Sequence, residues 1–129
     1  MDQPVGAVDR ESYWGWVGTA LFLLLPVDLF TTLLCVAIVG PDAESNPWMA
    51  WLLGQPPSVL VGVHLAVGVT AVAGFAAYEA ISRRSARFGS VMLQAGRAYL
   101  VLLTAVGFLV LLNNVSVLLF RQSLLPPVG

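Results

Sequence analysis

Three long apolar runs dominate the chain, and short polar segments separate them. The runs are Trp16–Gly40, Ser58–Ile81 and Ala98–Phe120. Each is longer than the roughly 20 residues that a helix needs to cross a hydrocarbon layer about 30 Å thick. Asp28 and Glu79 are the charged residues within them. The pattern therefore predicts an all-α fold: an integral membrane three-helix bundle with spans at about 16–40, 58–81 and 98–120.

The segment between the first two runs predicts a turn and then a short helix at the membrane surface. It begins with the acidic stretch Pro41–Pro47, whose Pro, Asp, Ser and Asn residues favour turns. Trp48 and Trp51 follow three residues apart and so share one face of a helix. Because Trp prefers the membrane interface, we expect an interfacial helix at about 47–54.

Charge differs between the two connections, and this difference predicts the orientation. Arg83, Arg84 and Arg87 lie in the second connection, whereas the first has acidic residues and no basic one. Basic connections stay on the cytoplasmic side. We therefore expect a multi-pass protein of the plasma membrane with its N-terminus cytoplasmic and its C-terminus outside. The same three arginines either attract anionic lipid headgroups, at ~1 kcal/mol each, or only set the topology.

With this orientation, polar side chains from all three spans fall in the outer half of the bilayer. Asp28 is the deepest of them, and Pro26 just before it predicts a kink. A carboxylate near mid-bilayer costs roughly 2.5–3.5 kcal/mol, so it faces a cavity or a partner. The candidate polar site consists of Asp28, Thr31, Thr32, Glu44, Asn46, His64, Asn113 and Asn114.

Each of these residues also has a structural interpretation. Asp28 can accept hydrogen bonds from Thr32 or Asn114. The two asparagines, Asn113 and Asn114, favour interhelical hydrogen bonds, which contribute ~0.6 kcal/mol on average. Thr31 and Thr32 favour bonds to carbonyls of their own helix. His64 is balanced between a ligand, a proton carrier and a packing residue.

For two further groups of residues, a structural role is favoured over a functional one. Glu79 is expected to pair with Arg83 at i+4 as a helical surface pair. Asp28, His64 and Glu44 offer carboxylate and imidazole groups to a metal, but no spacing motif supports such a site, so the metal is unknown.

Small residues predict where the helices pack, because they let helices approach closely in lipid. The second span has one ridge of small residues and a second ridge, containing His64, on its opposite side. The third span has an inward face that ends at Asn114. The predicted packing residues are Gly62, Ala66, Thr70 and Gly74 on the first ridge, Gly68 on the second and Gly107 on the third span.

Composition supports a membrane protein and excludes several other classes. The 129 residues are 58% hydrophobic and 10% charged, whereas soluble domains carry about 25% charged residues. We therefore treat 1–129 as a single transmembrane domain in contact with membrane lipid. A net charge of −1 gives no field that attracts nucleic acid. All six basic residues are Arg, a bias that favours a GC-rich or halophilic prokaryote.

Motifs for chemistry are missing from the sequence. No nucleotide loop, zinc motif or nucleophile elbow occurs, so the cofactor is unknown and an enzyme is the less favoured interpretation. The single Cys35 excludes an internal disulfide. The acidic start of the chain does not match a cleavable signal peptide, and we expect none.

Two stretches resemble the uncharacterised prokaryotic membrane proteins grouped as DUF5658. Asp28-Leu-Phe-Thr31 matches an Asp-x-x-Thr pattern in a first span, and Glu44-Ser-Asn-Pro-Trp-Met49 matches Glu-x-Asn-Pro-x-Met in the following linker. The resemblance covers about half of the chain, and His64 stands where a basic residue often follows in that family. It implies a three-helix membrane domain with Asp28, Glu44 and Asn46 as functional candidates, and no reaction.

Two hypotheses follow. In the first, the protein is an accessory or subunit-type membrane module that packs against partner helices, as a homo-oligomer or within a larger complex. In the second, an outward-facing polar site around Asp28 binds a cation, relays protons or acts on a lipid-linked substrate. Three spans are few for a transporter built from inverted repeats, and we favour the first hypothesis.

Overall fold

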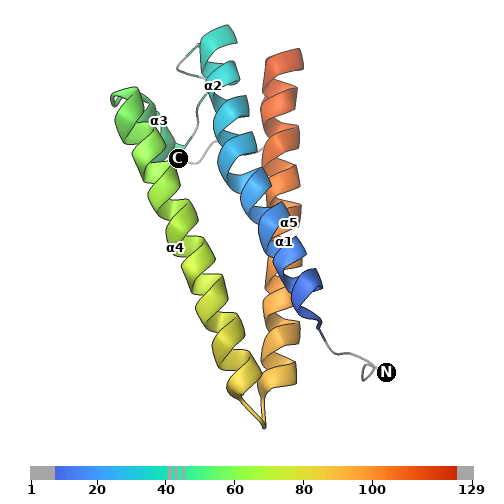
Figure 1. Ribbon diagram of the computed structural model, residues 1–129. Helices are drawn as coiled ribbons and strands as arrows, with labels where there is room; N and C mark the ends of the chain where they lie inside the picture. The colour runs from blue at the N-terminus through green and yellow to red at the C-terminus, as the bar shows by residue number, and fades with distance from the viewer. Residues whose placement is uncertain (1–7, 41, 43, 45, 125–129) are drawn as a thin grey trace.

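The computed structural model describes residues 8–40, 42, 44 and 46–124, and over these residues the regular structure is entirely helical. Three helical stretches are long and apolar enough to cross a membrane, which is compatible with a small membrane protein. The predicted fold class, three long helices with a short one after the first, is confirmed. The elements in chain order are α1 (Arg10–Phe22), η1 (Leu23–Val27), α2 (Asp28–Ile38), α3 (Pro47–Leu53), α4 (Pro57–Arg84) and α5 (Gly89–Phe120), shown in Figure 1.

The long helices extend beyond the apolar runs because capping residues and moderately apolar stretches add turns to their ends. The first begins at Arg10, where the side chain of Asp9 caps it by accepting a hydrogen bond from the N–H of Ser12 at 2.6 Å. The third begins at Gly89 and not at Ala98. In the predicted turn before α3, Pro41 and Ser45 lie outside the described residues.

The first span changes its hydrogen-bonding pattern around Pro26. Proline lacks an N–H and clashes with the carbonyl four residues back, so a regular α-helix cannot pass through it unchanged. Here Leu23–Val27 form a π-helical segment, and the N–H of Asp28 donates to the carbonyl of Leu23, five residues back. The disturbance predicted at Pro26 therefore takes the form of one wide turn that ends at Asp28.

The helix α5 contacts every other span. It packs along α1, η1 and α2 on one side and against α4 on another, whereas α4 meets α1 only sparsely and has no substantial contact with α2. In Figure 1, α4 and α5 converge at their connection. From there α4 diverges from α2, and the distance is greatest at the N-terminal end of α4, which lies beside α3. We call the end with the α4–α5 connection the basic end and the opposite end, with α3, the open end.

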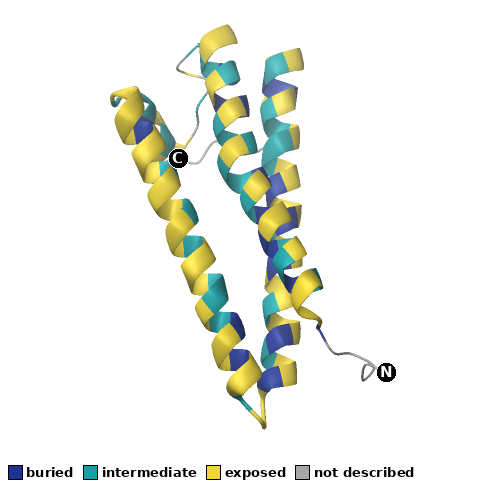
Figure 2. Ribbon diagram, viewed as in Figure 1, coloured by how far each residue is buried: buried dark blue, intermediate teal, exposed yellow. Residues whose placement is uncertain are grey.

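Burial follows this arrangement. Figure 2 shows buried positions where α1 and α2 face α5, while most of α4 is exposed. The hydrophobic core between α1 and α5 includes Tyr13, Val17, Ala20, Leu93 and Leu100. Within the described residues, the buried positions of α4 are Leu60, Glu79 and Ser82. The second span therefore leaves most of its apolar surface uncovered by the other described residues.

Glycine allows two close approaches between spans away from the α4–α5 connection. A Cβ atom added at Gly107 would lie 2.8 Å from Cβ of Leu23, and one added at Gly96 would lie 2.7 Å from a ring carbon of Tyr78. Real side chains would clash at these distances, so the helices approach here because glycine has no side chain. These contacts fix α5 against η1 at mid-height and against α4 near the basic end.

Candidate functional site

Asp28 and Asn114 join the first and third spans inside the apolar layer. The side-chain Nδ2 of Asn114 donates to Asp28 Oδ1 at 3.3 Å and to Thr31 Oγ1 at 2.8 Å. It also lies 3.5 Å from Thr32 Oγ1. Asp28 stands ten residues before the end of α2 at Ile38, which is about 15 Å along a helix. Its carboxyl group therefore lies near mid-bilayer depth, where a charge needs a partner.

The other polar side chains of α2 are satisfied within the same contact. Thr31 Oγ1 donates to the carbonyl of Val27 at 2.9 Å, a bond to its own helix of the predicted kind. The thiol of Cys35 lies 3.4 Å from the carbonyl of Asn114. Among the described residues, no buried side-chain nitrogen or oxygen lacks a hydrogen-bond partner. The contact between α2 and α5 is thus a complete polar seam, with the half-buried Asp28 at its edge.

His64 reaches the same region from α4. Its Nδ1 lies 2.9 Å from the carbonyl of Leu60, one turn earlier on the same helix. Because a carbonyl only accepts, Nδ1 carries a proton, which leaves Nε2 as the acceptor nitrogen whenever the ring is neutral. The half-buried ring is within electrostatic range of Asp28. The second span therefore contributes an imidazole to the polar region that α2 and α5 form.

Glu44 places a second carboxyl group near Asp28. It is half-buried, and its Oε1 accepts a hydrogen bond from the N–H of Asn46 at 2.7 Å. Asn46 caps α3 by accepting from the N–H of Trp48 at 3.1 Å. Burial raises the pKa of Glu44, the hydrogen bond from Asn46 offsets part of this rise, and the charge of Asp28 adds to it. The two carboxyl groups therefore influence each other's charge.

An apolar groove separates the first span from α4. Its volume is about 730 Å³. The two helices approach each other at Gly68, where an added Cβ would lie 3.3 Å from Leu25 Cδ1. From Val61 to Ala73 the groove follows α4 for about 18 Å, and His64 is the polar side chain among its lining residues. The lining consists of Leu25, Pro26, Leu29, Val61, His64, Leu65, Gly68, Val69, Val72 and Ala73.

Some predicted site residues lie apart from this region. The side-chain oxygen of Asn113 accepts hydrogen bonds from Ser123 Oγ at 2.9 Å and from the N–H of Leu124 at 2.8 Å, so it faces the segment that follows α5. In the described part of the chain, no three His, Cys, Asp or Glu side chains gather closely enough to hold a metal ion.

The predicted ridges of α4 differ in their surroundings. On the first ridge, Gly62, Ala66, Thr70 and Gly74 are all exposed, and a Cβ added at Gly62 or Gly74 would meet nothing within 4 Å. On the second ridge, Gly68 faces Leu25. Gly107, predicted to face inward on the third span, is buried against Leu23. The first ridge is therefore exposed along its length in the part of the chain that the structure describes.

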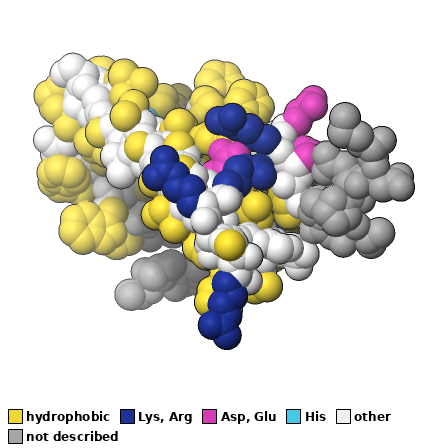
Figure 3. Space-filling view, turned by 60° about the horizontal axis from the view of Figure 1, so that its bottom comes forward, with side chains coloured by type: hydrophobic (Ala, Val, Ile, Leu, Met, Phe, Trp, Pro, Cys, Tyr) yellow, Lys and Arg dark blue, Asp and Glu magenta, His cyan; other side chains and the backbone are white. Residues whose placement is uncertain are grey.

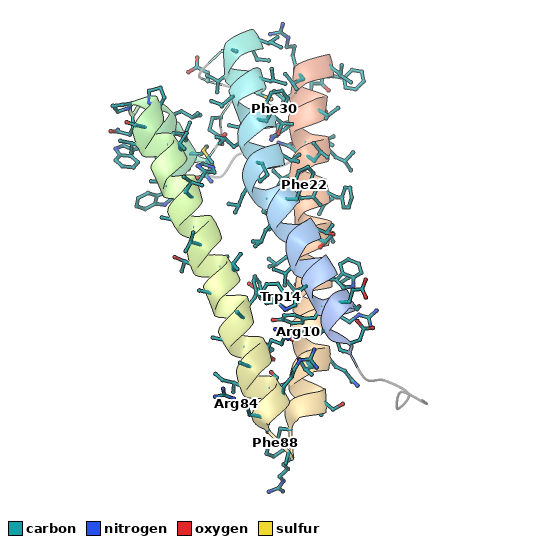
Figure 4. All side chains as sticks on the ribbon, viewed as in Figure 1. Arg10, Trp14, Phe22, Phe30, Arg84 and Phe88 are labelled. Carbon is teal, nitrogen blue, oxygen red and sulfur yellow. The ribbon has the colours of Figure 1, made fainter. Side chains whose placement is uncertain are left out.

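The basic end holds a polar network that the sequence pattern did not predict. Glu79 Oε1 accepts from Arg83 Nε at 2.7 Å and lies 3.4 Å from Arg10 Nε, while Oε2 accepts from Trp14 Nε1 at 2.6 Å. The predicted pair between Glu79 and Arg83 does form, but Glu79 is only 4% exposed and is also bound to α1. Figure 4 labels Arg10 and Trp14 near the start of α1.

Two tyrosines complete this network. The hydroxyl of Tyr13 on α1 donates to the carbonyl of Phe75 on α4 at 2.9 Å, and that of Tyr78 on α4 donates to the carbonyl of Met92 on α5 at 2.7 Å. They also line an apolar cavity of about 560 Å³ between α1, α4 and α5. The sequence signal for this network was the charged residue Glu79 within an apolar run. Residue spacing alone identified Arg83 as a partner but not the residues of α1. We call Arg10, Tyr13, Trp14, Tyr78, Glu79 and Arg83 the basic-end clasp.

The arginines of the α4–α5 connection gather at one end of the molecule. Figure 3 shows Arg side chains around an acidic group on this face. Arg83 is engaged by Glu79, while Arg84 and Arg87 are exposed, and the Arg87 guanidinium lies 5.1 Å from the ring centre of Phe88. Arg84 and Phe88 are labelled at this tip in Figure 4.

Comparisons with family models, with curated proteins and with solved structures gave no match to this chain. The resemblance to DUF5658 therefore stays a prediction, and the function has to be argued from the geometry.

Proposed function

We propose that the protein is a small multi-pass membrane module that binds a partner transmembrane helix in the groove between its first span and α4. The observation that carries this proposal is the separation of α4 from α2, which leaves an apolar groove of about 730 Å³ open along α4. Close packing at small residues favours helix association in lipid. The groove is lined by Gly68 and Ala73 among Val and Leu side chains, which suits the face of an apolar helix.

The free ridge of α4 supports assembly through a second surface. Gly62, Ala66, Thr70 and Gly74 are exposed on the side away from the groove. We propose that this ridge contacts another copy or another subunit, while lipid covers the remaining apolar surface. The protein then acts by binding and not by catalysis.

Site-specific photo-crosslinking in the native membrane tests the proposed function. One variant carries a photoreactive residue at Val69, which is 70% exposed and lines the groove. The control carries it at Leu102, which is 60% exposed on α5 and outside the groove lining. We expect a discrete protein adduct from position 69 that position 102 does not give. Labelling of lipid alone at both positions contradicts the proposal.

We also propose that the basic end faces the cytoplasm, where Arg84 and Arg87 meet anionic lipid headgroups. The charge difference between the two connections supports this orientation. Thiol labelling of intact cells tests it in a Cys35→Ser background, with one new cysteine at an exposed position of each connection. We expect an impermeant reagent to label Asp42→Cys and not Ala86→Cys, and the opposite result overturns the orientation.

A proton relay is a second candidate function. The observation that favours it is that Asp28 lies within electrostatic range of both His64 and Glu44. Proteoliposomes with an internal pH dye test it: we expect Asp28→Asn to abolish any proton flux while the protein still folds. A flux that persists in this variant contradicts the relay, and the binding function does not depend on the result.

A further inference from the structure

Asp28 lies beside the groove, and among the described residues no Lys or Arg pairs with it; the basic group within its electrostatic range is the imidazole of His64. Asp28 falls between Leu25 and Leu29, both of which line the groove. Its interactions are hydrogen bonds from the neutral groups of Asn114 and Thr32 and an electrostatic interaction with the imidazole of His64, while Glu44 brings a second negative charge near. The ion pairs of the described chain all involve Glu79. An intramembrane carboxylate is normally paired, and for Asp28 the described residues offer an imidazole but not the permanent cation of a Lys or Arg.

The chain itself does not supply that cation. It contains no Lys, and five of its six Arg residues precede residue 98, in or near the basic end. Arg121, beyond α5, donates from Nη1 to the carbonyl of Ile38 at 3.3 Å, which is about 15 Å along α2 from Asp28. A second copy in the same orientation has its arginines at the same depths. Self-association therefore brings no Arg to Asp28.

A lipid headgroup does not reach Asp28 either. The carboxyl group is about 15 Å along the helix from the end of α2, which is half the thickness of a ~30 Å hydrocarbon core. Headgroup amines stay at the interface, whereas a basic side chain on a transmembrane helix can stand at any depth. The groove beside Asp28 is apolar and about 18 Å long, as a helix face requires.

From these observations we infer that the partner helix carries a basic side chain, Lys or Arg, that pairs with Asp28 at mid-bilayer depth. This inference rests on the proposed function and adds the chemistry that selects the partner. Apolar contact in the groove holds the partner helix, and the pair with Asp28 distinguishes it from other apolar helices. Glu44 and the acceptor nitrogen of His64 strengthen the attraction for a cation.

Synthetic transmembrane helices provide the test, using the full-length protein in proteoliposomes. Three labelled Leu/Ala helices are identical except that the first has Lys at its centre, the second has Leu there, and the third has the Lys moved by two residues to the opposite face. A central Lys lies at the depth of Asp28 in either orientation. Binding to the labelled protein is measured by fluorescence energy transfer as a function of helix density.

We expect the central-Lys helix to bind about tenfold more tightly than the Leu helix. The advantage is lost in Asp28→Asn and with the displaced Lys. In Val69→Trp, which fills the groove, both central helices bind more weakly. A thermal unfolding measurement confirms that Asp28→Asn is folded. Glu44→Gln gives an independent measurement, because we expect it to reduce the binding advantage of the Lys helix only in part.

The outcomes separate this inference from the proposed function. If the Lys and Leu helices bind equally and Val69→Trp weakens both, the basic partner is wrong while the groove still binds a helix. If neither helix binds the wild-type protein, both the inference and the proposed function are overturned. If labelled copies of the protein instead pair with one another and Val69→Trp prevents it, the occupant is a second copy, and the inference fails.

Discussion

The molecule holds two carboxyl groups within apolar spans, Glu79 at the basic end and Asp28 nearer the middle of the helices toward the open end, and it surrounds them differently. At the basic end, Glu79 is bound by Arg10, Trp14 and Arg83, all from the same chain. Asp28, in the half of the molecule toward the open end, is half-buried, and its bonded groups, on Asn114 and Thr32, are neutral. The difference teaches that a charge in a span is not by itself a functional site. Glu79 has its arginine partners inside the chain, whereas Asp28 has none among the described residues, which is why we propose a basic partner helix for it.

Of the variants that test this comparison, we expect the one that removes the carboxyl group of the basic-end clasp to change stability the most. Glu79→Ala leaves Arg83 and the indole N–H of Trp14 without their acceptor, so we expect a loss of about 3 kcal/mol in the free energy of unfolding. Unfolding by a denaturing detergent in mixed micelles measures it. The matched control is Glu11→Ala, which changes an exposed acid on α1. Equal losses from both variants would show that the clasp does not hold the basic end together.

A pair of glycine substitutions compares packing at the two ends. A Cβ at Gly96 meets the ring of Tyr78, which its hydroxyl bond to Met92 keeps in place. We expect Gly96→Ala to lower the free energy of unfolding by about 1–3 kcal/mol. Gly62→Ala points into open space, and we expect it to be neutral or stabilising by less than about 1 kcal/mol. A destabilising Gly62→Ala in detergent would mean that the first ridge of α4 is covered, and self-association should then be measured.

The seam between α2 and α5 gives a smaller expected effect. Asn114→Ala removes the donor shared by Asp28 and Thr31. Single interhelical hydrogen bonds in membranes contribute at most about 1.7 kcal/mol, so we expect a loss of about 1 kcal/mol in detergent unfolding. Thr70→Ala, at an exposed position of α4, is the control. A loss as large as that of Glu79→Ala would mean that the open end is as tightly held as the basic end.

The smallest expected effect is the pH dependence of stability that Glu44 contributes. The pKa of Glu44 also depends directly on the charge of Asp28. Burial holds the pKa of Glu44 above its ordinary value, and Asp28 contributes to the rise. The folded state therefore binds this proton more readily than the unfolded state. Its contribution to stability is present below the ordinary pKa and is lost as the pH rises through the raised pKa. Carboxyl carbon shifts measured by NMR in micelles should show this pKa falling in Asp28→Asn, and an unchanged titration would contradict the coupling.

The sequence predicted the fold well because length and hydropathy alone decide whether a helix spans a bilayer. It also indicated Asn114 as one of two possible donors to Asp28, and this bond forms, since two polar groups at similar depths in lipid have few alternatives. It did not predict the clasp around Glu79. The partners Arg10 and Trp14 precede the first apolar run, and only the extension of α1 to Arg10 brings them beside α4. Nor did it predict the groove, because hydropathy does not encode the angle at which α4 leaves α5.

The wide turn at Leu23–Val27 has a consequence for how related chains should be aligned. Its i to i−5 bond to Leu23 places one more residue in that turn than an α-helix has. Everything from Asp28 onward is therefore rotated by about 100° relative to an uninterrupted α-helix. In a related chain without Pro26 and its wide turn, the helix needs one residue fewer before the Asp to bring that side chain to the same face. In most parts of a span, deleting one residue would turn the rest of the helix to the wrong side. Here, when Pro26 is replaced and the wide turn is lost, a one-residue deletion restores the original orientation.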